Sequence, residues 1–151
     1  MGNRSYRRSG KFYQDQVRLI LGLLDKQYRL GQLSVEVYLE ICDQKGIEPD
    51  PDEMPPEPGD YPYEVQVAFL LHDLLPDRWE GMSGSYMGKD YSSFQALLDI
   101  YDVEDRKEVC FFLKHIEARN ATKINDKLNK KQKANEQKAK GGGINSANLQ
   151  R

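Results

Sequence analysis

Six of the seven prolines lie between Gly46 and Pro62, in the stretch GIEPDPDEMPPEPGDYP, which also holds six acidic residues. Proline lacks a backbone N–H and fixes its own φ, so neither an α-helix nor a central β-strand can run through this stretch. We therefore expect an extended, acidic surface segment that is partly polyproline II. It serves either as a spacer or as a docking strip between two helical parts of the chain.

On both sides of this proline-rich segment, apolar residues recur with the period of an α-helix. Gly31 and Gly46 supply the left-handed residue that ends a helix, and Ser34 caps the start of the second one. The short connection between the first two helices predicts an antiparallel helical hairpin. The predicted helices cover residues 12–30, 35–45, 63–75, 93–101 (or 91–101, with Asp90 as the cap) and 104–140.

The third predicted helix is apolar nearly all round, so we expect it to be the most buried one. Ser92, with Gln95 three residues later, predicts a capping box for the fourth helix. No strand alternation of useful length occurs. The sequence therefore predicts an all-α bundle of about five helices. An extended acidic proline-rich loop, a glycine-rich loop and a protruding basic C-terminal helix complete the expected fold.

The net charge of −2 conceals an acidic middle between basic ends. Residues 1–11 carry +4, residues 12–118 carry −13 and residues 119–151 carry +7. We expect a basic disordered arm, an acidic helical domain, and a basic helix extension with a disordered tail over these three ranges. Basic ends attract nucleic acid, an acidic protein surface or the chain's own middle, or only keep the protein soluble. The expected basic-surface residues are Arg4, Arg7, Arg8, Lys127, Lys130, Lys131 and Lys133.

The chain offers no signal for a membrane or for secretion. Its longest central apolar run, Val67 to Leu71, is far shorter than the ~20 residues that span a bilayer. The charged N-terminus has no apolar stretch before Val17, unlike a secretory signal. Cys42 and Cys110 lie in helical patterns and are interpreted as buried thiols in a reducing compartment. We therefore expect a soluble, cytoplasmic protein with no membrane partner.

The segment from Pro76 to Tyr91, PDRWEGMSGSYMGKDY, superficially resembles a phosphate-binding loop. That motif needs four residues between its first glycine and Gly-Lys, followed by Ser or Thr. Here Gly84 and Gly88 enclose three residues, and Lys89 is followed by Asp90. The spacing and the extra carboxylate argue against nucleotide hydrolysis.

Other catalytic or metal-binding arrangements are also missing from the sequence pattern. His72 and His115 lie on different predicted helices, without the paired spacing of metal ligands. Both cysteines sit among apolar residues, which raise a thiol pKa and disfavour a nucleophile. We therefore predict no catalytic residues, no metal site and no cofactor.

The same glycine-rich segment has the makeup of a contact surface. It combines flexible backbone with large adaptable side chains, which often dominate protein interfaces. The alternative is that Trp79 and Tyr86 fold back as a lid over the bundle. The predicted partner-binding residues are Trp79, Met82, Tyr86, Met87 and Tyr91.

The block LPDRWEGMSGSYMGKDYSSFQALLDIYDVED, Leu75 to Asp105, followed by the lysine-rich helix, resembles small proteins encoded beside the tail genes of large contractile-tailed bacteriophages. Some of those proteins are tail assembly chaperones or minor baseplate components. The resemblance implies a viral protein that binds phage tail or baseplate proteins in the host cytoplasm, or that remains in the virion.

We therefore predict a non-enzymatic protein-binding factor, either a viral tail assembly chaperone or a minor virion structural protein. The alternative is a nucleic-acid-binding protein that uses its basic termini. Lysines alone supply salt-sensitive, non-specific attraction to phosphate, so such binding would not depend on sequence.

Overall fold

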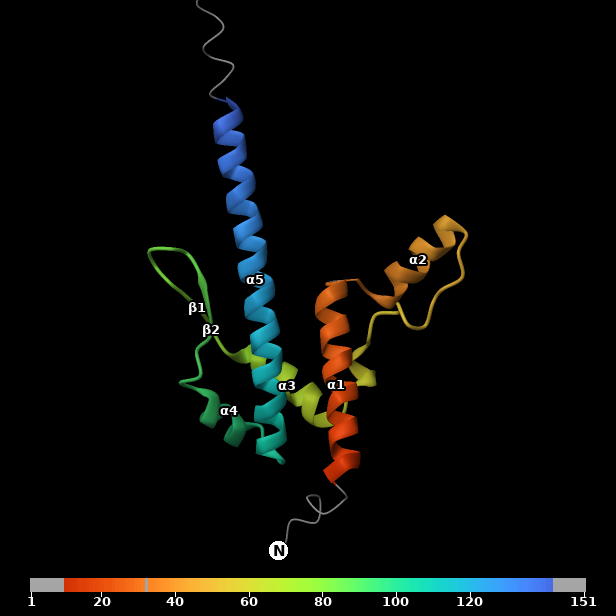
Figure 1. The fold of residues 1–151 in the computed structure, drawn as a ribbon. Helices are drawn as coiled ribbons and strands as arrows, with labels where there is room; N and C mark the ends of the chain where they lie inside the picture. Colours follow the sequence, from red (N-terminus) through yellow and green to blue (C-terminus); the bar gives the residue numbers. More distant parts are fainter. Residues whose placement is uncertain (1–9, 32, 143–151) are drawn as a thin grey trace, which may run out of the picture.

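The computed structural model describes residues 10–31 and 33–142 of the chain (Figure 1). Arg4, Arg7 and Arg8, and the tail from residue 143 onward, lie outside the described residues. The fold is predominantly α-helical, as predicted. Its elements are α1 (Gly10–Leu30), α2 (Val35–Lys45), the 3-10 helix η2 (Pro58–Asp60), α3 (Tyr63–Leu74), β1 (Asp77–Trp79), β2 (Tyr86–Lys89), α4 (Phe94–Ile100) and α5 (Arg106–Gly142).

The core forms where α3 and α1 pack against the first half of α5 (Figure 1). Burial of these side chains removes apolar surface from water, which is the main favourable contribution to folding. The prediction that α3 is the central helix is confirmed, although Leu70 and Leu74 leave one side of it about half exposed. The core side chains with 0% exposure are Leu24, Val65, Ala68, Leu71, Leu113 and Ile116.

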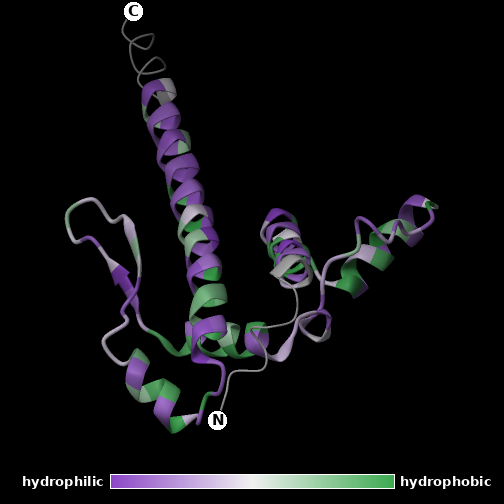
Figure 2. Ribbon diagram, turned by 60° about the horizontal axis from the view of Figure 1, so that its bottom comes forward, coloured by the Kyte–Doolittle hydropathy of each residue, from purple (hydrophilic) through white to green (hydrophobic). Residues whose placement is uncertain are grey.

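The second half of α5 projects beyond this core. Every side chain from residue 129 to residue 141 is exposed, and the ribbon of this part is hydrophilic along its length (Figure 2). We call residues 127–140 the basic shaft. The predicted protruding helix is confirmed.

The predicted ends of the second helix are confirmed. The Ser34 side chain accepts a hydrogen bond from the Val37 amide at 3.3 Å, and Gly46 adopts a left-handed φ of 64°. The capping box predicted for α4 is wrong. Ser93 occupies the cap position, and its side chain makes no capping hydrogen bond. The Asp90 carboxylate accepts the Ser92 amide at 2.9 Å, so residues 90–92 form a turn and the helix begins after it.

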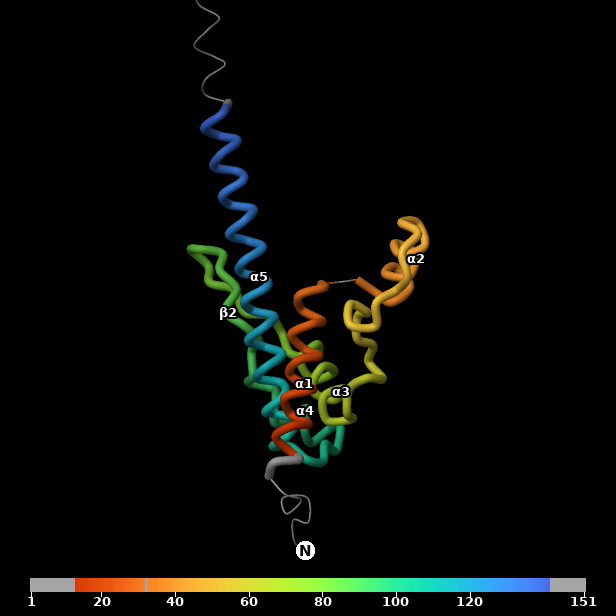
Figure 3. The backbone as a smooth tube through the Cα atoms, turned by 45° about the vertical axis from the view of Figure 1, so that its right-hand side comes forward, coloured from red at the N-terminus to blue at the C-terminus, as the bar shows by residue number. Residues whose placement is uncertain are grey.

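The prediction that α1 and α2 form an antiparallel hairpin is also wrong. Figures 1 and 3 show α2 leaving α1 at an angle, with the proline-rich segment returning beside it. The Tyr38 hydroxyl binds this segment, accepting the Asp50 amide at 3.0 Å. The segment therefore takes the place beside α2 that α1 was expected to fill. We call residues 35–60 the acidic arm.

The glycine-rich segment is not the unstructured loop that the sequence predicts. It forms an antiparallel β-hairpin, in which β1 and β2 pair, and β2 packs against α5 (Figure 1). The strands are three and four residues long, too short to leave a readable alternation in the sequence. In the described part of the chain, no helix combines the length and apolar character needed to cross a membrane.

Candidate functional site

The β-hairpin carries most of the residues that the sequence marks as a contact surface. Asp77 pairs with Lys89 and Trp79 with Tyr86, and between these two pairs β2 has one residue more than β1, so the bulge lies in the second strand. The strand β2 alternates in burial, so that Tyr86 and Gly88 face α5 while Met87 faces away from it. The hairpin therefore has one face fixed to the helix and one face exposed.

The tip of the hairpin is closed by the Glu80 carboxylate. Its two oxygens accept the amides of Met82 at 3.1 Å and Ser83 at 2.5 Å. Hydrogen bonds from Ser83, followed by that from the Met82 amide, hold the pKa of Glu80 below its usual value. A turn of backbone amides is the kind of place where a phosphate binds. Here the chain's own carboxylate already occupies it.

The base of the hairpin is fixed by Glu117 on α5. Oε1 of Glu117 accepts the Lys89 amide at 2.7 Å, and Oε2 lies 2.6 Å from Nε2 of His72 on α3. A Cβ atom added to Gly88 would overlap this carboxylate, and Gly88 also has a φ of 89°. Both facts favour glycine at this position. One carboxylate thus joins α3, α5 and the hairpin.

A second anchor, Asn125, lies about two helical turns beyond Glu117 on α5. The Asn125 amide accepts from the Tyr86 backbone N–H and donates to the Tyr86 carbonyl, both at 3.1 Å. The Asp77 carboxylate accepts the Tyr86 hydroxyl at 2.9 Å and pairs with Nζ of Lys89 at 2.9 Å. The hydrogen bond from Lys89, reinforced by that from Tyr86, lowers the pKa of Asp77. Side chains of α5 therefore bind backbone groups of β2 that a third strand would otherwise bind.

Three of the predicted contact residues surround the free end of the hairpin. Met82 at the tip is 98% exposed, Met87 is 53% exposed and Trp79 is 51% exposed. The Trp79 ring packs edge-to-face on its cross-strand neighbour Tyr86, with ring centroids 5.1 Å apart. Cross-strand neighbours share a face, and the next residue along a strand points to the other face. Trp79 and Met87 therefore lie on opposite faces, with Met82 between them at the end.

The other two predicted contact residues have different surroundings. Tyr86 is only 4% exposed and acts as an anchor, so it does not belong to the exposed group. Tyr91 lies beyond β2 and packs edge-to-face on Phe94 of α4, at 5.7 Å between ring centroids. Burial raises the pKa of Tyr91 to about 12, and the negative charge of Glu117 adds to the shift. The sequence left open whether this segment is a contact surface or a lid over the bundle. Tyr86 packs against the bundle as a lid residue would, whereas Trp79 stays accessible as a contact residue would.

The contact between His72 and Glu117 was missed by sequence reasoning, because the two residues are 45 positions apart and no motif links them. Both are held inside the fold, with side chains 6% and 16% exposed. Both oxygens of Glu117 already have partners.

In the described residues, no group of three or more His, Cys, Asp or Glu side chains is placed to hold a metal ion, and both cysteines are free thiols.

The basic shaft places four of the predicted basic-surface residues together on exposed helix. These are Lys127, Lys130, Lys131 and Lys133. Among the described residues, none of them lies within 4.0 Å of a carboxylate. Their positive charge is therefore available to a partner from outside this part of the chain.

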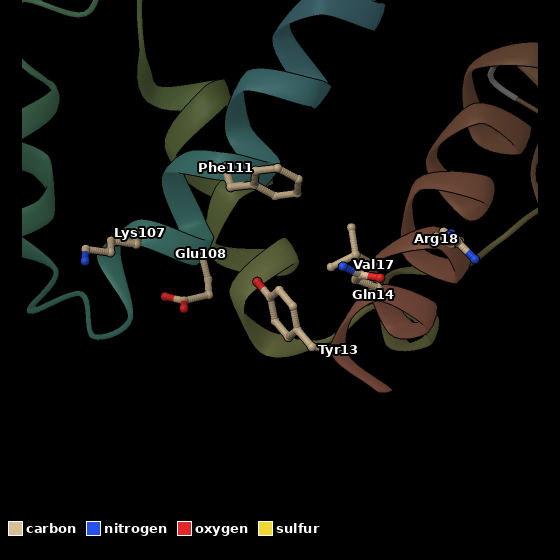
Figure 4. A pocket seen from close by; sticks show the side chains of 7 residues that line it. All are labelled: Tyr13, Gln14, Val17, Arg18, Lys107, Glu108 and Phe111. Atoms are coloured by element: carbon tan, nitrogen blue, oxygen red, sulfur yellow. The ribbon is translucent and has the colours of Figure 1, made fainter. Parts of the chain in front are cut away.

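An open hollow of about 470 Å³ lies between the start of α1 and the start of α5 (Figure 4). Tyr13 and Val17 face Phe111 across it, and charged side chains of Arg18, Lys107 and Glu108 stand at its edge. No sequence pattern predicts this hollow, because its two walls come from helices far apart in the chain. It brings together no set of groups that would carry out chemistry.

Comparisons of the chain with protein-family models, with curated proteins and with solved structures find no match.

We predict that Gly88→Ala destabilises the protein more than Gly84→Ala does. Both glycines have positive φ, so alanine costs about 1–2 kcal/mol at either place. Only at position 88 does the new Cβ displace Glu117 and leave the Lys89 amide without its acceptor, adding about 1–3 kcal/mol. Urea unfolding of the two variants measures the difference. Equal losses of unfolding free energy would contradict the proposed anchor.

Proposed function

We propose that this chain is a non-enzymatic protein-binding factor and that the free end of its β-hairpin is the contact surface. The observation that carries the proposal is the exposure of Trp79, Met82 and Met87 around a hairpin whose base is fixed to α5. Large apolar side chains on one small projection are expensive to leave in water, and such groups often mark protein-interaction sites.

The fixed base supports this proposal on energetic grounds. A loop that must become ordered on binding loses conformational entropy at that moment, which reduces affinity. Here Asn125 and Glu117 already order the two ends of β2 before any partner arrives. Methionine adapts to irregular surfaces, and tryptophan gives a large contact area. The hairpin is therefore a preformed platform with an adaptable tip.

The arrangement of the three side chains indicates the shape of the partner. Because Trp79 and Met87 lie on opposite faces, a flat surface could not contact both. The partner that fits is a protein with an apolar cleft that receives the hairpin end. The resemblance to phage tail-module proteins leads us to propose a tail or baseplate protein as that partner, with this chain as an assembly chaperone or minor virion component.

The test compares Trp79→Ala and Met82→Ala with Leu19→Ala, a matched control because Leu19 on α1 is 71% exposed and distant from the hairpin in the fold. Proteins that co-purify with the wild-type chain from its native cells are identified by mass spectrometry, and their affinities are measured for each variant. We expect the Trp79 change to weaken binding by about 2 kcal/mol, or about 30-fold in Kd, and the control to leave it unchanged.

Stability measurements separate contact from folding in that experiment. Trp79→Ala also loses its edge-to-face contact with Tyr86, worth about 0.5–1.5 kcal/mol. Met82→Ala should leave the unfolding midpoint unchanged, since the side chain is almost fully exposed. If binding falls only in step with stability, or if no captured protein distinguishes the hairpin variants from the control, the proposal is wrong.

The second candidate, non-specific nucleic-acid binding, is supported by the basic shaft, whose lysines have no acidic partner in the described structure. Phosphate binding through lysine releases counterions, with a salt slope of about 0.9 per contact on duplex DNA. Changing Lys127, Lys130, Lys131 and Lys133 to Gln should therefore weaken DNA binding and flatten its salt dependence. Binding that survives these changes excludes the shaft as the site, and no binding by the wild type at low salt excludes this candidate.

A further inference from the structure

We infer that the basic shaft of one molecule binds the acidic arm of a second copy of the same chain. The inference is independent of the hairpin and of its proposed partner. It rests on two surfaces of opposite charge that project from one fold without covering each other (Figures 1 and 3).

The acidic arm has a strong net charge that the fold leaves uncompensated. Residues 35–60 contain nine carboxylates and one base, Lys45, for a net charge of −8. No ion pair within 4.0 Å involves any of these carboxylates in the part of the chain that the structure describes. Like charges held this close repel one another, so a positive surface brought against the arm would be attracted.

The basic shaft has the matching properties. Residues 127–140 contain six lysines and one acid, Glu136, for a net charge of +5. At 1.5 Å per residue the shaft is about 21 Å long, comparable with the roughly 16 Å of helix α2. The two surfaces therefore match in sign and approximately in length.

The position of α1 favours a second copy as the occupant. Helix α1 lies between the first half of α5 and the arm, and the shaft and the arm both project away from the core towards the same side (Figure 1). A second molecule turned about a two-fold axis can place its shaft on the first arm and its arm on the first shaft, forming two equivalent contacts. Nucleic acid fits less well, because its phosphates could bind the shaft but would leave the negative charge of the arm uncompensated.

The test is a pair of charge-reversal variants of the full chain, followed by sedimentation velocity at several protein concentrations. The shaft variant carries Lys127→Glu, Lys130→Glu, Lys131→Glu and Lys133→Glu, which changes the shaft from +5 to −3. The arm variant carries Glu40→Lys, Asp43→Lys, Glu48→Lys, Asp52→Lys and Glu53→Lys, which changes the arm from −8 to +2. All nine of these side chains are exposed, and none of them caps a helix or fixes the core.

The wild type should associate at about 0.01 M salt and return to monomer at about 1 M, where screening acts within about 3 Å. Each variant alone should remain monomeric, because its arm and shaft then carry the same sign. An equimolar mixture should associate again, since every contact between unlike molecules is once more between opposite charges. A control that reverses four exposed bases elsewhere should associate like the wild type. It carries Arg29→Glu, Arg78→Glu, Lys107→Glu and Lys114→Glu.

Several outcomes overturn the inference. One is a wild type that is monomeric at low salt, and another is association that persists in either single variant. Association that disappears after nuclease treatment would assign the shaft to nucleic acid. Failure of the mixture to associate, when both variants keep the circular dichroism of the wild type, would exclude contact between copies.

Discussion

The carboxylate of Glu117 joins three parts of the molecule, because Oε1 accepts the Lys89 amide of β2 at 2.7 Å while Oε2 lies 2.6 Å from Nε2 of His72 on α3. A partly buried carboxylate is stable only when its oxygens have partners, and here both have them. The same contact favours glycine at position 88. The hairpin is thereby placed on α5, and its orientation decides which side chains face solvent.

The molecule divides into a fixed base and three projections, of which the hairpin is one. The core of α1, α3 and the first half of α5 holds the hairpin tip, the acidic arm and the basic shaft apart from one another (Figure 1). The tip offers apolar contacts, whereas the arm and the shaft offer opposite charges. Apolar burial contributes most of the affinity in protein association, and charge complementarity contributes specificity and speed. One small chain can therefore make apolar contacts through the tip and charged contacts through the arm and the shaft.

Local signals in the sequence predicted the helices and the caps at Ser34 and Gly46, because these depend on residues close together in the chain. The hairpin could not be predicted in that way, since its hydrogen bonds come from Glu117 and Asn125, 28 and 39 residues from their partners. The burial of Tyr86 has the same origin. An aromatic residue in a glycine-rich segment suggested a contact residue, and only the position of α5 showed it to be an anchor. The predicted antiparallel packing of α1 and α2 was wrong because Tyr38 of α2 binds the proline-rich segment instead.

The most direct test of the account is amide hydrogen exchange at Lys89 and Tyr86, whose N–H groups bind Glu117 and Asn125. A hairpin fixed to α5 predicts that both amides exchange at least about 1,000-fold more slowly than in an unstructured peptide. Their protection should approach that of Leu113 in the buried part of α5. If both amides exchanged at the unstructured rate while Leu113 stayed protected, the hairpin would be a free loop, and the account of a preformed contact surface would be wrong.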